Sequence, residues 1–510
     1  MNALLLWPEF PSTYWSYSYS LKLVGKKSLT PPLPLLTVAA MLPKSWKASL
    51  VDLNVRPVGD AELRKADVVL ISGMFVQRAS IHDLVDRCRR LGTTTIVGGP
   101  FATSQPHLLG EADHVFTGEG EGCIESMCAD LEAGTLPHRV RGDDKPDLTT
   151  SPTPRYDLLE ADAYFHMALQ YSRGCPFSCE FCDIIVMYGR VPRVKTPEQI
   201  AEELDAIAAT GFRGSVFFVD DNFIGNKKAV RKLLPAVRDW QERHDHPFHF
   251  YTEASLNLAE DSTLMTSMVE TGFNSVFIGI ESPSAEAISE MRKSQNLRGE
   301  ISERVHQVLQ HGMDVWAGFI LGFDSDGPKI FDDQIEVIER AAIPFAMVGL
   351  LYALPGTPLT ARLEAEGRLR DFDGEDQFAR ANFEPKMPEV QLLGGYKKVL
   401  GAIYDPKRYL DRVLAMMRLR RVHTHEKRKR IGFRQIVWGA RALITQGLLS
   451  RYAAEYRRFL REVWRWDPSR LVEAIQRAGA GHHFIEYTRR VVLPRLDEAI
   501  NDVQAAAHKR

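Results

Sequence analysis

Short apolar runs alternate with polar, amphipathic segments through the first 140 residues of the chain. Such runs are typical of buried strands, and the segments with helical periodicity predict helices beside them. The predicted strands are residues 4–6, 48–53, 67–72, 94–97 and 114–117. The predicted helices are residues 80–91 and 121–131. This alternation predicts an α/β domain over residues 1–140, built on a doubly wound, Rossmann-like parallel sheet.

A second stretch of alternation follows a linker. Residues 141–160 hold charges, Ser, Thr and Pro, which is the composition of a linker. Residues 161–385 then predict six strand–helix units, and hence a partial (β/α)6 barrel. Its strands are predicted at residues 168–172, 215–219, 248–252, 275–279, 315–321 and 346–350, and its helices at 197–210, 227–242, 261–271, 301–310 and 328–341. Residues 386–510 are Arg-rich and helical in pattern, which predicts a mainly helical C-terminal domain.

Glycine and other small residues gather where three strands of the first sheet should end. The residues at these turns are Ser72 and Gly73, Gly98 and Gly99, and Gly118, Glu119 and Gly120. Ligands of a doubly wound sheet bind at the carboxyl ends of its strands, where glycine allows the backbone to approach a ligand closely. Each turn by itself is equally typical of a plain strand-to-helix connection, but three in one half of a sheet favour a ligand.

Composition narrows the class of protein. The 510 residues include 64 Lys and Arg against 66 Asp and Glu, so the net charge of −2 argues against binding of nucleic acid by the whole chain. Six cysteines are too few for a disulfide scaffold. The apolar runs are shorter than the ~20 residues that span a bilayer, and the first residues lack the pattern of a signal peptide. We therefore expect a cytoplasmic protein.

The strongest chemical signal is a loop that carries three cysteines directly after the first predicted barrel strand. Cys175, Cys179 and Cys182 have the spacing C-x3-C-x2-C. A structural zinc site needs four ligands, and His166 is the only nearby candidate for the fourth. An iron–sulfur cluster accepts three thiolates and leaves one iron open to an outside ligand. The spacing favours the cluster, with zinc as the alternative.

This loop resembles the signature of radical S-adenosylmethionine (SAM) enzymes, including an aromatic residue, Phe181, before the third cysteine. The resemblance extends over residues 165–360 and implies a 4Fe-4S cluster that binds and cleaves SAM. It implies that Asp221, Glu253 and Glu281, each at a strand end, help to place SAM. Arg292, with Lys293 and Gln295 close by, is expected to meet the SAM carboxylate. Taken singly, such carboxylates equally often cap a following helix.

The first domain resembles the cobalamin-binding domain that precedes the barrel in one subclass of these enzymes. The turns at Gly98 and Gly118 carry this resemblance, but the chain has no Asp-x-His-x-x-Gly motif to supply a histidine ligand to cobalt. The lower face of cobalamin is then expected to meet the loop after Ser72. The residues expected to bind cobalamin are Ser72, Met74, Phe75, Gln77, Gly98, Gly99, Gly118, Glu119 and Gly120.

These resemblances imply a radical SAM C-methyltransferase that abstracts hydrogen from an unactivated carbon and transfers methyl from methylcobalamin. The alternatives are an oxidase, cyclase or rearrangement enzyme that uses cobalamin differently or not at all, and a noncatalytic iron–sulfur protein. No catalytic side chain is assigned, because the cofactors carry the chemistry. The expected partners are a small-molecule or lipid-like substrate and a flavodoxin or ferredoxin as electron donor.

Basic stretches at residues 416–421 and 427–430 suggest peripheral contact with the inner membrane. The alternatives are binding of a phosphorylated substrate or a solvated helix face. A similar helical domain follows the barrel in a group that includes hopanoid methylases.

Overall fold

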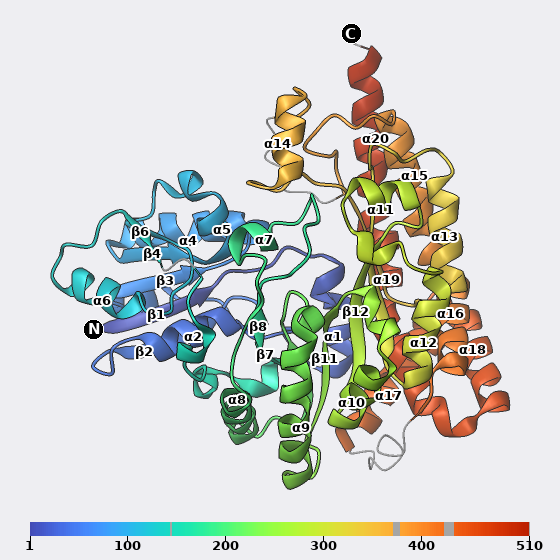
Figure 1. The fold of residues 1–510 in the computed structure, drawn as a ribbon, viewed down its shortest axis with the longest axis horizontal. Coiled ribbons are helices and arrows are strands. Elements are labelled where there is room, and N and C mark those ends of the chain that lie inside the picture. The colour runs from blue at the N-terminus through green and yellow to red at the C-terminus, as the bar shows by residue number, and fades with distance from the viewer. Residues whose placement is uncertain (143–144, 371–377, 423–432, 509–510) are drawn as a thin grey trace. The chain divides into compact units, whose positions relative to one another are not determined.

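A computed structural model describes residues 1–142, 145–370, 378–422 and 433–508 of the chain (Figure 1). The contacts within it divide the chain into two compact units. The first unit comprises residues 1–12, 26–177 and 183–250, and the second comprises residues 13–25, 178–182 and 251–510. The domain boundaries drawn at residues 140, 160 and 385 stay a prediction.

The first unit contains the predicted doubly wound sheet. Its strand order is β2-β1-β3-β4-β5-β6, and the paired strands are parallel. Alternate residues of β1 and β3 enter two separate cores, with Leu4, Leu6 and Ile71 on one face and Leu5 and Leu70 on the other. Since both faces are covered, these strands read as continuous apolar runs. The strands are β1 (Asn2–Trp7), β2 (Lys47–Asp52), β3 (Val68–Ser72), β4 (Thr94–Gly98), β5 (His114–Thr117) and β6 (Arg139–Arg141).

The two predicted helices beside this sheet are present as α4 and α6, with shifted starts, and three further helices are found. The helices are α2 (Leu33–Met41), α3 (Asp60–Lys65), α4 (Arg78–Leu91), α5 (Gly99–Ser104) and α6 (Ile124–Glu132). Helix α6 begins three residues later than predicted, because the Glu119 and Glu121 carboxylates before it are buried in ion pairs. Helices α2, α3 and α5 were not predicted from the pattern. Prolines at the start of α2 obscure its periodicity, and α3 and α5 have only six residues each.

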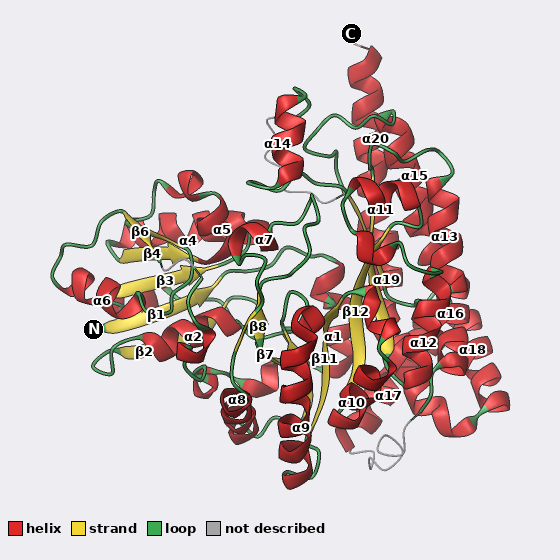
Figure 2. Ribbon diagram, in the orientation of Figure 1, coloured by secondary structure: helices red, strands yellow, loops and turns green. Residues whose placement is uncertain are grey.

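The second sheet has the strand order β14-β13-β12-β11-β10-β7, which confirms the partial barrel of six strands (Figure 2). The first predicted strand is divided into β7 and a short β8, and β8 pairs antiparallel with β9. The strands are β7 (His166–Leu169), β8 (Ser172–Arg173), β9 (Arg193–Val194), β10 (Gly214–Phe218), β11 (Phe248–Ala254), β12 (Phe273–Glu281), β13 (Asp314–Leu321) and β14 (Ala346–Leu350). The helices between them are α7 (Ile184–Met187), α8 (Pro197–Ala209), α9 (Lys227–Arg243), α10 (Ser262–Thr271), α11 (Ala285–Glu290), α12 (Ile301–His311), α13 (Ile330–Arg340) and α14 (Pro358–Ala365).

The C-terminal region is helical, as predicted. Its helices are α15 (Glu389–Ile403), α16 (Pro406–Leu419), α17 (Phe433–Ile444), α18 (Ala453–Trp466), α19 (Leu471–Tyr487) and α20 (Leu493–His508). None of the helices in the described ranges combines the length and apolar character needed to cross a bilayer. Residues 427–430, the second predicted basic stretch, lie outside the described residues.

Candidate functional site

In the first unit, two neighbouring aspartates after β10 hold the start of the cysteine loop. Asp221 accepts a hydrogen bond of 2.9 Å from the backbone N–H of Gly174. Asp220 accepts hydrogen bonds from the backbone N–H groups of Ser172 and Tyr171. Burial raises the pKa of Asp221 to about 6 and that of Asp220 to about 7. The Asp221 carboxylate therefore orders the loop that precedes Cys175, and its expected contact with SAM stays a prediction.

Cys175 itself lies in a closely packed turn of the first unit. Gly174 has a φ of +94°, and a Cβ there would lie 2.9 Å from the carbonyl oxygen of Gly189, so only glycine fits. The Asn222 side-chain amide donates to Cys175 Sγ at 3.8 Å. An N–H donor at the sulfur is one of the ways in which proteins tune an iron–sulfur cluster.

Two buried glutamates connect the end of β5 to the same loop. Arg173 donates to Glu119 and to Glu121, with N···O distances of 2.7 Å to each, and Arg193 of β9 donates to Glu119 at 2.7 Å. Burial acts to raise the pKa of Glu121, but the charge and hydrogen bonds of Arg173 outweigh it and lower the pKa. The Glu119 carboxylate contacts both arginines, and its expected contact with cobalamin stays a prediction.

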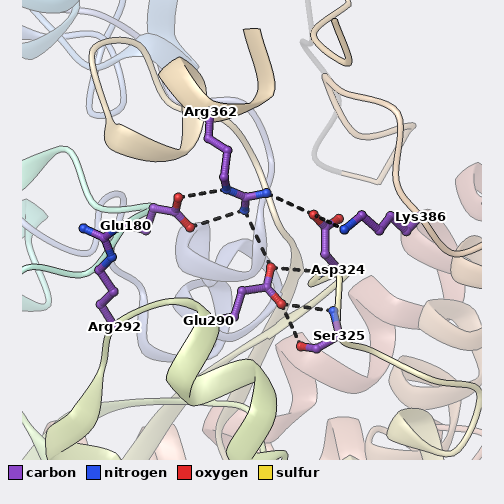
Figure 3. Close-up of a pocket in the computed structure, with 7 residues that line it drawn as sticks. All are labelled: Glu180, Glu290, Arg292, Asp324, Ser325, Arg362 and Lys386. Carbon is purple, nitrogen blue, oxygen red and sulfur yellow. Dashed lines mark hydrogen bonds and ion pairs between the residues drawn. The ribbon is translucent and has the colours of Figure 1, made fainter. Parts of the chain in front are cut away.

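In the second unit, residues 178–182 are fixed by backbone and side-chain contacts. The Glu180 N–H donates to the Met291 carbonyl at 3.0 Å, and the Glu180 carbonyl accepts from the Leu359 N–H at 3.0 Å. Arg362 of α14 donates to both carboxylate oxygens of Glu180, at 2.9 and 3.3 Å (Figure 3). Phe181 packs against an apolar cluster that includes Met291. The segment that carries Cys179 and Cys182 is therefore held from α14 and from the turn after α11.

Arg362 is the centre of a polar pocket in this unit. It lies 3.0 Å from Asp324 and 3.6 Å from Glu290, in addition to Glu180 (Figure 3). Arg292 also lines the pocket, and no dashed line joins it to the other residues drawn (Figure 3). Within the described part of the chain, Arg292 is exposed and no ion pair to it is found. Such a cation is available to an anionic group of a ligand.

Glu281 and Lys293 form a buried pair at the end of β12. Glu281 has a φ of +68°, and the register with β13 shifts between Gly279 and Glu281. Lys293 Nζ donates to Glu281 Oε1. Burial acts to lower the pKa of Lys293, but the negative charges of Glu281, Cys179 and Cys182 raise it. Lys293 therefore lies close enough to both cysteines to interact with their thiolates electrostatically.

Buried amides beside this pair have hydrogen-bonding atoms without partners. Neither amide atom of Gln295 has a partner among the described residues, and the side-chain oxygen of Asn296 also has none there. Asn296 Nδ2 donates to the carbonyl of Gly279 at 2.9 Å, which fixes the other end of its amide. Since unpaired buried polar groups are rare and costly, these atoms fit the polar groups of a bound ligand such as SAM.

The donor chemistry also fits a cluster held by three thiolates. Cys175, Cys179 and Cys182 carry no disulfide. Cys175 belongs to the first unit, and Cys179 and Cys182 to the second. Among the described side chains, no three His, Cys, Asp or Glu residues are gathered as a metal site. The fit therefore rests on three thiols that form no disulfide and on the nitrogen donors of Asn222 and Lys293.

The loop after β3 offers an apolar surface in the first unit. Met74 and the neighbouring Val76 are exposed, whereas Phe75 lies under the Arg78 guanidinium, 4.3 Å from its ring centre. Gln77 is buried; it donates to the Pro8 carbonyl at 2.6 Å and accepts from the Met74 N–H at 2.9 Å. Gln77 thus holds the loop in shape. An exposed apolar loop without a histidine fits a cobalamin face that takes no imidazole ligand.

The glycine turns of the first unit are closely packed. Gly99 has a φ of +88°, and a Cβ there would collide with Ser72 Oγ. Gly118, at φ +89°, donates its N–H to Thr103 Oγ1 at 3.0 Å. Gly98 and Gly120 pack near Phe116 and Ile124, respectively. The close packing and the positive φ angles explain why glycine occupies these turns. The contacts of these glycines with cobalamin stay predictions.

Sequence reasoning missed several residues that organise the site. Glu253, which was expected to follow the third barrel strand, lies within β11 instead. Asp220, Arg173, Glu180 and Arg362 were not predicted as site residues, although the first three lie within three residues of predicted ones. Arg362 is separated from Glu180 by 182 positions, so no local signal indicates their contact.

Comparison with known proteins places the chain in a family. Residues 169–338 match the Radical SAM superfamily, residues 26–127 match the B12 binding domain, and residues 357–494 match a domain of unknown function, DUF4070. An uncharacterized methyltransferase of Synechocystis sp. is 47% identical, over 81% of this chain and 78% of that protein. The hopanoid C-2 methylase of Rhodopseudomonas palustris is 35% identical, over 95% of this chain and 93% of that protein.

Two solved structures share the fold. The cobalamin-dependent SAM radical enzyme OxsB superposes with a TM-score of 0.59 at 14% identity, over 99% of this chain and 83% of that one. The radical SAM methyltransferase TsrM from Kitasatospora setae superposes with a TM-score of 0.61 at 13% identity, over 92% of this chain and 99% of that one. The family matches replace the zinc alternative with a 4Fe-4S cluster, SAM and cobalamin as cofactors. The chain is an enzyme of the B12-binding radical SAM family, homologous to its methyltransferases.

Proposed function

We propose that this enzyme transfers a methyl group to an unactivated carbon of an apolar, hopanoid-like substrate. The observation that carries the proposal is the 35% identity to hopanoid C-2 methylase along 95% of the chain. An identity of this extent covers both cofactor regions and the helical C-terminal region. A flavodoxin or ferredoxin as electron donor stays a prediction.

In this proposal, Cys175, Cys179 and Cys182 hold the cluster. Lys293 and Glu281 lie beside SAM, and the unpaired Gln295 amide and the exposed Arg292 contact its polar end. When bound, the cluster and SAM supply a carbon-centred radical, and cobalamin supplies the methyl carrier. The side chains position these groups and keep water away, and none of them transfers a proton in the proposal.

The half-exposed face of β12 and β13 in the second unit supports an apolar substrate. Phe277 and Trp316 are register partners, and Gly279 and Gly318 are register partners two residues further along. Residues two apart lie on the same face of a strand, about 7 Å from each other. The Trp15 ring lies 5.4 Å from that of Phe277. These aromatic rings offer an apolar surface, whereas the space over Gly279 is occupied by the Glu281 carboxylate and Lys293, and that over Gly318 by the Phe277 ring.

Reconstitution of the protein with its cofactors tests the proposal. We expect an anaerobic reaction with methyl-labelled SAM, a hopanoid and a one-electron reductant such as dithionite to yield a labelled product and 5′-deoxyadenosine. The Cys179→Ala variant should lose SAM cleavage by at least about a hundredfold, because the cluster loses a ligand. Cys128→Ala is the matched control, since Cys128 is a buried core residue of the first unit.

Two results would contradict the proposal in different ways. Deoxyadenosine formation by Cys179→Ala equal to that of the parent protein would remove the cluster assignment. SAM cleavage with no label in any product would leave the cluster in place and favour an oxidase, cyclase or rearrangement enzyme instead.

A further inference from the structure

Large apolar side chains are exposed in the segment between α17 and α18, which is π-helical over Thr445–Leu449. Leu448 and Leu449 are 70% and 76% exposed, and Leu443 and Ile444 at the end of α17 are also exposed. Single exposed leucines are common on protein surfaces, but a contiguous apolar patch indicates a binding surface. All four residues belong to the second unit.

Helix α18 continues this surface with a basic face. Tyr456, Phe459 and Val463 are buried and define the inner face of the helix. The opposite arc carries Arg457, Arg461, Trp464 and Arg465, all exposed, with Trp464 at 62%. Arg457 donates to the carbonyl of Gly447, so the basic face of α18 contacts the segment that carries Leu448 and Leu449.

These arginines differ from their neighbours in their pairing. In the described ranges, no ion pair is found for Arg457, Arg461 or Arg465. Arg458, on the side of the same helix, pairs with Asp411 and Glu462 at 2.6 Å. Their charge is therefore available to an anionic partner.

The predicted basic stretch at 416–421 is only partly exposed. Arg420 is buried and lies 2.9 Å from Asp314, and Arg418 lies over the Trp466 ring at 5.8 Å. Among the described residues of this region, arginines without an ion pair that adjoin the exposed leucines are found on α18.

We infer that Leu448, Leu449, Arg457, Arg461, Trp464 and Arg465 form a contact surface for an anionic lipid bilayer; we call this set the α18 surface. Leucines enter the boundary of the acyl chains, tryptophan prefers the interface, and arginines attract anionic headgroups. A second copy of the chain is a poorer partner, because a two-fold symmetric contact would place the same arginines against one another. This inference goes beyond the proposed function and does not depend on it.

Sedimentation of the full-length protein with vesicles tests the inference without substrate. We expect binding to phosphatidylcholine vesicles that contain phosphatidylglycerol, and binding should weaken with added salt because the headgroup attraction is screened. L448S/L449S should weaken binding by at least about tenfold, since two apolar side chains no longer enter the bilayer. R457Q/R461Q/R465Q should remove the dependence on phosphatidylglycerol and on salt.

The controls are L108S and R90Q, which change exposed residues of the first unit. Both should bind vesicles as the parent protein does. Equal vesicle binding by L448S/L449S and the parent protein would overturn the inference. So would light scattering that shows a dimer in the parent protein and a monomer in L448S/L449S, because the partner would then be a second copy. Neither result bears on methyl transfer, which is measured separately.

Discussion

At the scale of single residues, the Gln295 amide is informative because its environment does not satisfy it. It is 7% exposed, and neither of its polar atoms has a partner among the described residues. A folded chain that keeps such a group bears a cost of about 1–3 kcal/mol, which a ligand relieves on binding. A substitution of Gln295 should therefore change the affinity for the ligand without lowering the stability of the ligand-free protein.

Gln295→Leu should leave the ligand-free protein as stable as the parent or more so, because an unsatisfied amide is replaced by an apolar group of similar size. The same change should weaken SAM binding by about tenfold, since a hydrogen bond to the ligand is lost. Thermal unfolding and equilibrium dialysis measure the two effects. A large loss of stability with unchanged SAM affinity would show that the amide has a structural partner instead.

At the scale of elements, one ion pair links α14 to residues 178–182, the segment that carries Cys179 and Cys182. Arg362 donates to Glu180, which lies between Cys179 and Cys182, while Asp324 beyond β13 holds Arg362 from its other side at 3.0 Å. Glu180 is buried, so loss of Arg362 would leave a buried charge without its partner. The position of the segment thus depends on an element far along the chain.

Arg362→Gln should make Cys179 and Cys182 react several-fold faster with iodoacetamide in the metal-free protein, because the segment between them loosens. Mass spectrometry of the alkylated peptides gives the rates, and Cys175 in the first unit is an internal reference. Arg380→Gln is the matched control, since Arg380 forms a similar pair with Glu389 that does not involve Glu180. Unchanged rates in Arg362→Gln would exclude this positioning role.

At the scale of the whole molecule, buried ion pairs make the second unit sensitive to acid. Burial acts to raise the pKa of Asp324, but hydrogen bonds from Arg368 and Arg362 outweigh it and lower the pKa from 3.8 to about 2. Burial also acts to raise the pKa of Glu473, but the charges of Arg477 and Arg470 outweigh it and lower the pKa from 4.5 to about 2. A carboxyl whose pKa is lower in the folded than in the unfolded protein stabilises the fold at pH values above its unfolded-state pKa. This stabilisation is lost as the pH falls toward the folded-state pKa.

We therefore expect the free energy of unfolding to fall as the pH decreases from 4.5 to 2. Asp324→Asn should reduce this dependence, because it removes one of the responsible carboxyls, and should destabilise the protein at higher pH. Urea unfolding at a series of pH values measures both. Asp86→Asn, which changes an exposed ion pair of the first unit, should leave the dependence as it is. An unchanged pH dependence in Asp324→Asn would contradict the assignment.

Much of the fold could be read from local pattern. The strands of both sheets except β6 were predicted within a few residues, because each contains a run of apolar or alternating apolar residues. Strand β6 (Arg139–Arg141) was missed, since two of its three residues are exposed arginines. The cysteine loop and the Gly98–Gly99 turn were also predicted from the sequence, because the residues that define each motif lie close together along the chain. The contacts of Glu119 with Arg173 and Arg193 could not be found, because they join segments 54 and 74 positions apart.

By itself, the sequence determined the alternation that makes two parallel sheets, the three thiols on one loop and the residue types at the strand ends. The tertiary structure alone decided which charges are paired. It buried Arg420 against Asp314, brought Lys293 to Glu281 and left the arginines of the α18 surface facing outward. The physical reason is that periodicity acts between neighbours in the chain, whereas the partner of a buried charge is set by which distant elements pack against it.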